Sequence, residues 1–383
     1  MRIAFATTLS TKGSTIIGRV IPLCEELSKQ HEVHILLLEQ RQSLPISSKL
    51  IFHSVGQEPF TRTSHGKKRL KGLALIFSML STAMHTARTL HRIKPDRIVI
   101  VKTYPHNVLG VWLWRLFNKQ GQIILDVDDF ELTATVLTSL LQRASIHWAE
   151  RKAAQISEAI SAASPFLVDH FKNLAPTKEI SLILTGLPPT LISSLPAISD
   201  THSQTLLYCG SLSITSGHRI DLLPEILEKC QLPDKPVRLL LAGSGDDEAK
   251  LRTEFEKRQL NDLVTWHGRF TEADIPELLK KSAIIIDPID TSIAQRAKSS
   301  FRVMLALAAG WPLVTSNVGF RADAVPENWH HRFFAKPQDT ESYAEKIRSL
   351  LQQYPVNNER NELRAMADQW SWHEIAKDFE KLL

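Results

Sequence analysis

Basic and hydroxyl side chains mark the start of a predicted helix in the segment KSSFRVMLALAAGWPLVTSNVG, whose first residue is Lys298. They belong to Lys298, Ser299 and Arg302. Apolar residues after Arg302 recur at helical spacing, Gly310 suits the left-handed position after a helix, and Pro312 prevents the helix from continuing. Because backbone N–H groups at a helix start favour an anion, the segment predicts a phosphate-binding site.

Carboxylates form a second cluster at the end of the predicted strand in QIILDVDDFE, namely Asp126, Asp128, Asp129 and Glu131. Such a group could bind a cation, raise the pKa of its members, or accept a proton from a hydroxyl group. A capping and turn cluster, with Asp126 partly buried, is the structural alternative. We favour a functional role, because loops at the carboxyl ends of strands form the ligand crevice of an open α/β sheet.

Further candidates lie in other loops at strand ends. His106, in VKTYPHN, could be a base or an acceptor contact, although a lone loop histidine is as often merely exposed. Gly13 and Ser14 follow the first strand and Gly243 follows a strand in AGSGDD, and ordinary turns explain both equally well. Asp290, in DPIDTS, could bind a sugar hydroxyl or cap a turn.

The elements that must position these residues alternate between short apolar strands and helices in both halves of the chain. This alternation predicts parallel, doubly wound α/β sheets. Strands are expected at 2–7, 32–38, 50–55, 98–101, 122–126, 159–163, 180–184, 205–209, 237–242, 264–267, 283–287 and 313–314. Helices are expected at 16–29, 70–91, 145–160, 219–230, 247–258, 273–281, 302–309, 340–353 and 372–383.

A stretch rich in Pro and Ser, residues 188–203, has no helical or strand period and is interpreted as a linker. It separates predicted domains at 1–187 and 204–365, and residues 366–383 carry the last helix. The net charge of +5, from 46 basic and 41 acidic side chains, argues against a dedicated nucleic-acid-binding protein. With no apolar leader and no run of 18 apolar residues, we expect a cytoplasmic protein that does not span a membrane.

Several segments together resemble the glycosyltransferases with the GT-B fold, specifically the large family-4 type (glycosyl transferases group 1). The segment at Lys298 matches their donor-site pattern S-K-x-x-E-A-x-A-x-G-x-P-V-V at Gly310 and Pro312, with Arg302 at the lysine. LLYCGSLSITSG, RLLLAGSGDDEAKL, VTWHGRF and AIIIDP follow in the family's order, and QIILDVDDFE resembles a subset whose strand ends in D-x-D-D. The resemblance covers nearly the whole chain. It implies two Rossmann-like domains facing across a cleft, the first on the acceptor side and the second on the donor side, with the last helix crossing back to the first domain.

The resemblance also implies which residues meet the substrates. A nucleotide-sugar donor would bind at Gly13, Ser14, Gly210, Ser211, Ser216, Arg219, Gly243, His267, Asp290, Lys298, Ser299 and Arg302. Asp128 stands where many members have a histidine near the reacting sugar, so Asp128 and His106 are the catalytic candidates. These enzymes usually neutralise the diphosphate with basic side chains and a helix start, so neither a metal nor another cofactor is expected.

Four positions depart from the family's pattern. Ser211 and Ser216 replace an arginine and a lysine that contact the diphosphate, and Ala297 and Leu305 replace a pair of glutamates. A hydroxyl supplies no charge, and a leucine accepts no hydrogen bond from a ribose. We therefore expect the nucleotide-sugar donor to be bound in an unusual way. The alternative is a non-catalytic GT-B protein that acts as a binding module or as the partner subunit of an active glycosyltransferase.

The expected activity is transfer of a sugar, with retention, from a nucleotide sugar to a glycan or lipid-linked acceptor in cell-surface polysaccharide, lipopolysaccharide or glycolipid assembly. Retention is implied by the resemblance alone. Basic residues at 67–69 and 71 precede a largely apolar helix, which fits a peripheral contact with anionic lipids on the inner face of the membrane. A core-facing helix with a solvated basic start is the alternative that we favour.

Overall fold

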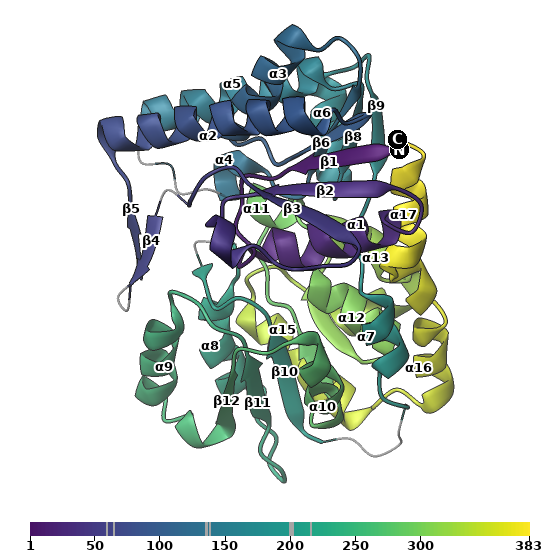
Figure 1. Cartoon of the computed structure of the whole chain (residues 1–383). Helices are drawn as coiled ribbons and strands as arrows, with labels where there is room; N and C mark the ends of the chain where they lie inside the picture. The colour runs from purple at the N-terminus through teal and green to yellow at the C-terminus, as the bar shows by residue number, and fades with distance from the viewer. Residues whose placement is uncertain (59, 64–65, 135–136, 138, 199–202, 215–216) are drawn as a thin grey trace. The chain divides into compact units, whose positions relative to one another are not determined.

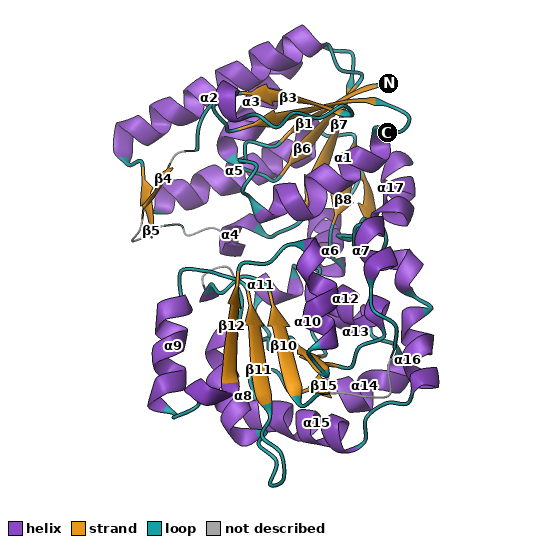
Figure 2. Cartoon of the chain, turned by 60° about the horizontal axis from the view of Figure 1, so that its bottom comes forward, coloured by secondary structure: helices purple, strands orange, loops and turns teal. Residues whose placement is uncertain are grey.

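The structure is a computed structural model that describes all residues except 59, 64–65, 135–136, 138, 199–202 and 215–216. The chain divides into two compact units: unit 1 is Met1–Thr185 with Ile375–Leu383, and unit 2 is Gly186–Glu374. Each unit is built on a parallel sheet with helices packed against it (Figure 1, Figure 2). Within the described ranges, no helix has the combined length and apolar character that crossing a membrane requires.

Unit 1 has a seven-stranded sheet in the order β3-β2-β1-β6-β7-β8-β9, with parallel neighbours throughout. Its strands are β1 (Arg2–Ala6), β2 (Glu32–Leu37), β3 (Leu50–Ser54), β6 (Arg97–Val101), β7 (Gln122–Val127), β8 (Ala159–Ala162) and β9 (Glu179–Leu182). Its helices are η1 (Ile16–Val20), α1 (Ile21–Leu27), η2 (Arg41–Ser43), α2 (Gly72–Ile93), α3 (Pro105–Phe117), α4 (Glu131–Ala134), α5 (Leu140–Ile156) and α6 (Pro165–Leu174). An antiparallel hairpin that we did not predict, β4 (Phe60–Thr63) with β5 (Gly66–Arg69), precedes α2.

Unit 2 has a six-stranded parallel sheet in the order β12-β11-β10-β13-β14-β15. Its strands are β10 (Thr205–Cys209), β11 (Arg238–Ala242), β12 (Val264–Gly268), β13 (Ile284–Ile286), β14 (Leu313–Ser316) and β15 (Phe334–Ala335). Its helices are α7 (Pro189–Ser194), η4 (Ile220–Leu222), α8 (Leu223–Lys229), α9 (Glu248–Lys257), η5 (Asn261–Leu263), η6 (Glu272–Asp274), α10 (Ile275–Lys280), α11 (Ile293–Arg296), α12 (Phe301–Ala309), α13 (Phe320–Ala324), α14 (Glu327–Phe333), α15 (Thr340–Gln352), α16 (Asn357–Arg364) and η7 (Ala367–Trp370).

The strand orders confirm the predicted doubly wound sheets. In each unit the first three strands are added in one direction and the later strands in the other. Right-handed crossovers therefore place helices on opposite faces of the sheet. This explains why central strands such as RIVIV of β6 read as continuous apolar runs, since both of their faces are covered.

Three local predictions can be compared with the elements. The stop at Gly310 is confirmed, because α12 ends there with Gly310 at φ 65°. The helix predicted at 145–160 is wrong at both ends: Ser139 caps α5, and Ser157 is already extended ahead of β8. Residues 188–203, interpreted as a linker, contain α7, which begins with a proline in its first turn and buries Leu191.

The C-terminal helix α17 (Trp372–Glu380) starts in unit 2, and its residues from Ile375 onward belong to unit 1. Phe379 stacks on Phe5 of β1, with ring centres 6.2 Å apart. His31 Nε2 lies 3.0 Å from Glu380 Oε1. The chain end is therefore part of the core of unit 1.

Candidate functional site

Each sheet has one switch point, a pair of neighbouring strands from which the chain continues toward opposite edges of the sheet. In unit 1 it lies between β1 and β6, and in unit 2 between β10 and β13. Ligands of open α/β sheets bind at the carboxyl ends of the strands beside such a point. Most of the predicted site residues lie in the loops that follow these strands or their neighbours β7 and β11.

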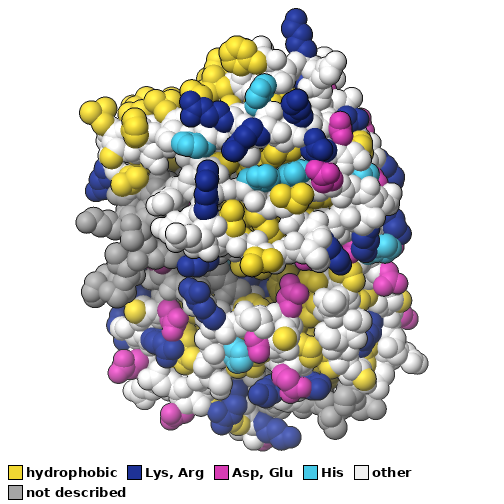
Figure 3. All heavy atoms as spheres, viewed as in Figure 1, with side chains coloured by type: hydrophobic (Ala, Val, Ile, Leu, Met, Phe, Trp, Pro, Cys, Tyr) yellow, Lys and Arg dark blue, Asp and Glu magenta, His cyan; other side chains and the backbone are white. Residues whose placement is uncertain are grey.

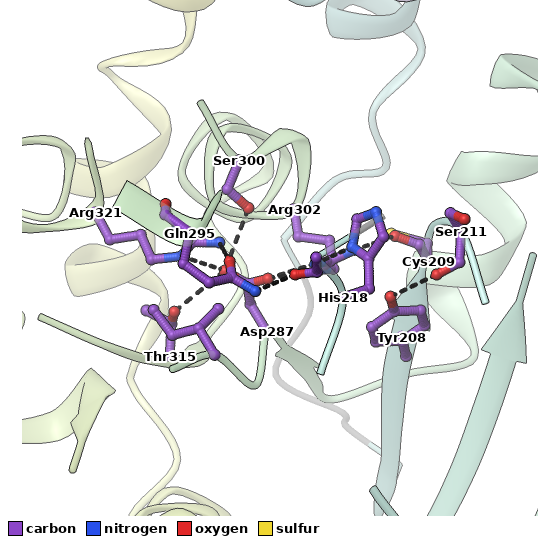
Figure 4. Close-up of polar contacts among 12 residues, drawn as sticks. Tyr208, Cys209, Ser211, His218, Asp287, Gln295, Ser300, Arg302, Thr315 and Arg321 are labelled. Atoms are coloured by element: carbon purple, nitrogen blue, oxygen red, sulfur yellow. Dashed lines mark hydrogen bonds and ion pairs between the residues drawn. The ribbon is translucent and has the colours of Figure 1, made fainter. Parts of the chain in front are cut away.

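Arg302 lies in the first turn of α12, but its guanidinium is directed toward Asp287 (Figure 4). Nη2 and Nε of Arg302 lie 2.6 Å and 2.8 Å from Oδ1 of Asp287. Nη1 donates to the carbonyl of Cys209 at 3.2 Å, and the guanidinium carbon lies 4.5 Å from the ring centre of Tyr208. Only 6% of Arg302 is exposed. This corrects the expectation of a helix-start cation available for phosphate, because the guanidinium is buried and already pairs with a carboxylate.

Asp287 follows β13, is completely buried and binds a second arginine. Arg321 Nε lies 2.6 Å from Oδ2 of Asp287, and the hydroxyls of Ser300 and Thr315 donate to the same oxygen, each at 3.2 Å. Burial raises the pKa of Asp287, but Arg321 and Arg302 outweigh burial and hold the pKa well below its usual range. Asp287 is therefore the centre of a buried ion cluster.

Lys298 and Ser299 lie just before Ser300, the N-cap of α12, and both are partly buried. The Nζ of Lys298 lies 3.6 Å from the position that a Cβ on Gly217 would take, so the ammonium lies against the loop after β10. Unlike Arg302, Lys298 keeps part of its surface exposed beside a helix N-terminus, which favours an anion.

Arg219 joins the loops that follow β10 and β13. Its Nη1 lies 3.0 Å from Oδ2 of Asp290, and its Nη2 lies 2.7 Å from Oδ2 of Asp221. Asp290 also accepts the backbone N–H of Ser292 at 2.9 Å, so the turn that we left open for Asp290 is present. Two carboxylates therefore share the charge of Arg219.

The other predicted donor residues lie farther from α12 or fix the loops. A Cβ on Gly243 would lie 1.8 Å from the carbonyl oxygen of Gly210, so only a glycine lets the loops after β10 and β11 touch. Ser211 is partly buried beside them. His267 is exposed on β12, which β11 separates from β10. Ser216 lies outside the described residues.

In unit 1, Lys102 is the centre of the carboxylate cluster, which the sequence pattern did not reveal. Its Nζ lies 2.9 Å from Oδ1 of Asp128, 2.7 Å from Oδ2 of Asp129 and 3.0 Å from Oε1 of Glu131. Lys102 directly follows β6 and has φ 65°, a left-handed conformation that is uncommon outside glycine. Such backbone conformations concentrate at functional sites, because the surrounding structure must hold them.

The single charge of Lys102 offsets part of the negative charge of the three carboxylates. Burial lowers the pKa of Lys102, but the three carboxylates outweigh burial and raise the pKa well above its ordinary value. Burial raises the pKa of Glu131, and Lys102 opposes that rise. One oxygen each of Asp128, Asp129 and Glu131 lies within 4.8 Å of the others, close enough to hold a metal ion. Since a charged ammonium already lies within 3.0 Å of all three, the donor set fits an internal ion cluster better than a metal site.

Asp126 does not belong to this cluster, although we had grouped it there. Only 1% of Asp126 is exposed, and its two oxygens bind Nη2 and Nε of Arg19 at 2.6 Å and 2.9 Å. Ser161 donates a further hydrogen bond at 2.6 Å. Asp126 lies within β7, so its side chain points into the core, whereas Asp128 follows the strand end.

The turn at Gly13 and Ser14 lies beside this cluster. Thr15, which directly follows Ser14, donates its hydroxyl to Oδ2 of Asp128 at 2.8 Å. The structure thus brings the loop after β1 together with Asp128, as the switch point requires.

His106 is not an exposed loop residue but lies in the first turn of α3. Its ring stacks on Tyr104 with centres 6.0 Å apart, and both ring nitrogens are buried. Burial lowers the pKa of His106 to about 4. His106 is therefore neutral near pH 7, and its place in α3 corrects the loop assignment.

The lowered pKa of His106 predicts a loss of stability in acid. In the unfolded chain the ring binds a proton near its ordinary pKa of 6.5, and in the folded chain only near about 4. Folding stability is therefore lost as the pH falls from 6.5 toward 4, by about 2 kcal/mol for this group at pH 5. We expect His106→Phe to reduce by that amount the difference in unfolding free energy between pH 7 and pH 5, measured by urea denaturation. An unchanged pH dependence would show that His106 titrates normally when folded.

Comparison with known proteins adds to this geometry. Residues 198–370 match the family model described as glycosyl transferases group 1. The whole chain superimposes on sucrose-phosphate synthase from Thermosynechococcus elongatus (TM-score 0.71, 16% identity, 100% of this chain and 98% of that chain). It also superimposes on HepE from Anabaena in complex with UDP (TM-score 0.72, 14% identity, 100% of this chain and 99% of that chain). A third similar structure is WaaG, a glycosyltransferase involved in lipopolysaccharide biosynthesis (TM-score 0.69, 14% identity, 100% of this chain and 99% of that chain). No curated protein sequence matches the chain. The fold is GT-B, as the sequence resemblance implied.

Proposed function

We propose that this protein, whose residues 198–370 are a glycosyl transferases group 1 domain within a GT-B fold, transfers a sugar from a nucleotide sugar to a glycan or lipid-linked acceptor. The observation that carries the proposal is the grouping of Lys298, Arg219 and the N-terminus of α12 at the switch point of unit 2. Such a place suits the diphosphate of a donor, which carries the negative charge that the site must neutralise.

Lys298 and the first N–H groups of α12 bind the diphosphate in this proposal. Arg302, held by Asp287, instead fixes the loop after β10, since its Nη1 bonds to Cys209 and borders Gly210. These groups neutralise the leaving phosphate without a metal. The complex of HepE with UDP makes uridine nucleotides the first donors to test.

Asp128 acts beside the reacting sugar in the proposed mechanism. Lys102 and Thr15 fix its two oxygens, so the carboxylate is held in one orientation. A neutral His106 lies at the adjoining strand end and shapes the acceptor site, while its buried ring nitrogens take no proton from the acceptor. Transfer proceeds with retention and serves assembly of a cell-surface polysaccharide, lipopolysaccharide or glycolipid on the cytoplasmic side of the membrane.

The experiment is calorimetry with a panel of nucleotides and nucleotide sugars, followed by an assay of donor hydrolysis and transfer. We expect at least one nucleotide sugar to bind and Lys298→Gln to weaken binding by roughly 10-fold or more, since a hydrogen bond to a charged group contributes about 1.5–3 kcal/mol. Lys281→Gln is the matched control, because Lys281 is exposed on unit 2 away from this segment. Unchanged affinity in Lys298→Gln would overturn the phosphate assignment.

A second function is favoured by the buried positions within the donor segment. The hydrocarbon side chains of Leu305 and Ala297 cannot accept a ribose hydrogen bond, and both are buried in the core of unit 2. A non-catalytic GT-B protein that partners an active glycosyltransferase would have such a site. Absence of binding across the whole panel would support this second function over the first.

A further inference from the structure

Helix α2 turns large apolar side chains outward along its first half, whereas Leu90 and Ile93 near its end are buried. Five of them are exposed on one face at helical spacing: Leu73, Ile76, Phe77, Leu80 and Met84. The exposed fractions reach 84% at Leu73 and 77% at Phe77. The structure therefore contradicts the core-facing helix that we favoured from the sequence.

The buried face of α2 is lined by small and polar residues, among them Thr82, Ala83 and Thr86. Gly110 of α3 fits against this face, since a Cβ there would lie 2.8 Å from Thr86 and 2.9 Å from Ala83. The close contact with α3 uses the small residues, and the large ones stay exposed in the described part of unit 1. An exposed apolar stripe of this size marks an interaction surface.

Helix α5 adds to the same surface. Leu140 and Leu141, in its first turn, are 85% and 73% exposed. Trp148 of α5 packs edge-on against Trp112 of α3, with ring centres 6.5 Å apart. Because α2, α3 and α5 each lead into the amino end of a following strand, their first turns lie toward the edge of the sheet that carries Asp128. Figure 3 shows hydrophobic side chains gathered over α2.

The charge of the three helices indicates what covers this surface. α2 and α3 contain no Asp or Glu. α5 contains one acidic residue, Glu150, which is buried and whose Oε1 lies 3.1 Å from Nε2 of His170. Exposed cations border the apolar face, including Lys71, Arg88 and Arg143. A second copy of this surface would bring like charges together, whereas an anionic bilayer offers both acyl chains and negative headgroups.

We propose that the α2 stripe and the first turn of α5, together called the apolar surface, dock unit 1 on an anionic bilayer. The proposal draws on the proposed function for its purpose, since docking would place the edge with Asp128 near a lipid-linked acceptor. Binding to the bilayer is measured without a sugar donor and without sugar transfer. The docking proposal can therefore fail while the proposed function holds, and the reverse.

The test is co-sedimentation with vesicles of phosphatidylcholine alone or mixed with phosphatidylglycerol. We expect the full chain to sediment with the mixed vesicles, and Leu73→Ser/Phe77→Ser to weaken binding by roughly 10-fold or more, since burial of one such side chain contributes about 1.5–3 kcal/mol. Ile46→Ser/Val356→Ser is the matched control, because both residues are exposed apolar residues outside the surface. We expect this control to bind the mixed vesicles as the wild type does. Nucleotide binding should be unchanged in both double variants.

Three outcomes overturn the proposal. Equal binding of both double variants would show that the apolar surface does not insert. Equal binding to both vesicle types would show that headgroup charge plays no part. A dimer in light scattering that only Leu73→Ser/Phe77→Ser dissociates, without vesicle binding, would assign the surface to a second copy of the chain.

Discussion

Asp287→Asn is expected to lower the free energy of unfolding of unit 2 by about 3–5 kcal/mol, because it leaves the guanidinium groups of Arg302 and Arg321 buried without a counter-charge. The amide keeps the size of the carboxylate and can still accept hydrogen bonds from Ser300 and Thr315. The loss is therefore one of charge and not of packing. Urea denaturation at pH 7 measures it.

Asp262→Asn supplies the control for this result, since Asp262 is an exposed aspartate of the same unit. It is expected to change stability by less than about 0.5 kcal/mol. The pKa of Asp287 is held below that of an unfolded aspartate, so its contribution is complete above the unfolded pKa of 3.8 and is lost as the pH falls below that value. If Asp287→Asn unfolds at the wild-type urea concentration, the cluster does not stabilise unit 2.

The same cluster shows why site residues were harder to predict than the fold. Apolar runs and helix stops are local signals, so the strands and the end of α12 at Gly310 could be predicted from neighbouring residues. The direction of the Arg302 side chain depends on Asp287 and Arg321, which lie 15 positions before and 19 positions after it. A helix-start position alone therefore predicted an anion site where the fold places an internal ion pair.

Unit 1 gives the complementary case. The candidate residues of this unit were predicted in loops at strand ends, and the hydrogen bond from Thr15 to Asp128 brings the loops after β1 and β7 together. The cation that pairs with these carboxylates was not predictable. Lys102 reaches them from a left-handed backbone conformation that no residue pattern signals. The outward face of α2 was missed for a related reason: small residues, rather than large ones, pack against α3.

Lys102→Met is expected to lower the free energy of unfolding of unit 1 by about 3–5 kcal/mol at pH 7, since it leaves Asp128, Asp129 and Glu131 close together without a cation. In the variant, mutual repulsion raises the pKa values of these carboxylates. The variant should therefore regain stability as the pH falls and protons replace the missing charge. Urea denaturation at pH 7 and pH 5 measures both effects.

Lys94→Met is the matched control, because Lys94 is an exposed lysine of the same unit with φ 52°. It carries the same cost of placing methionine in a left-handed conformation, so the difference between the two variants isolates the ion cluster.

The geometry also predicts that the vacated centre binds a divalent cation, since the three oxygens lie within 4.8 Å of one another. Calcium or manganese should then raise the melting temperature of Lys102→Met and leave the wild type and Lys94→Met unchanged. Equal stability of the two variants, with no response to either metal, would mean that the ammonium of Lys102 does not hold this end of the sheet together.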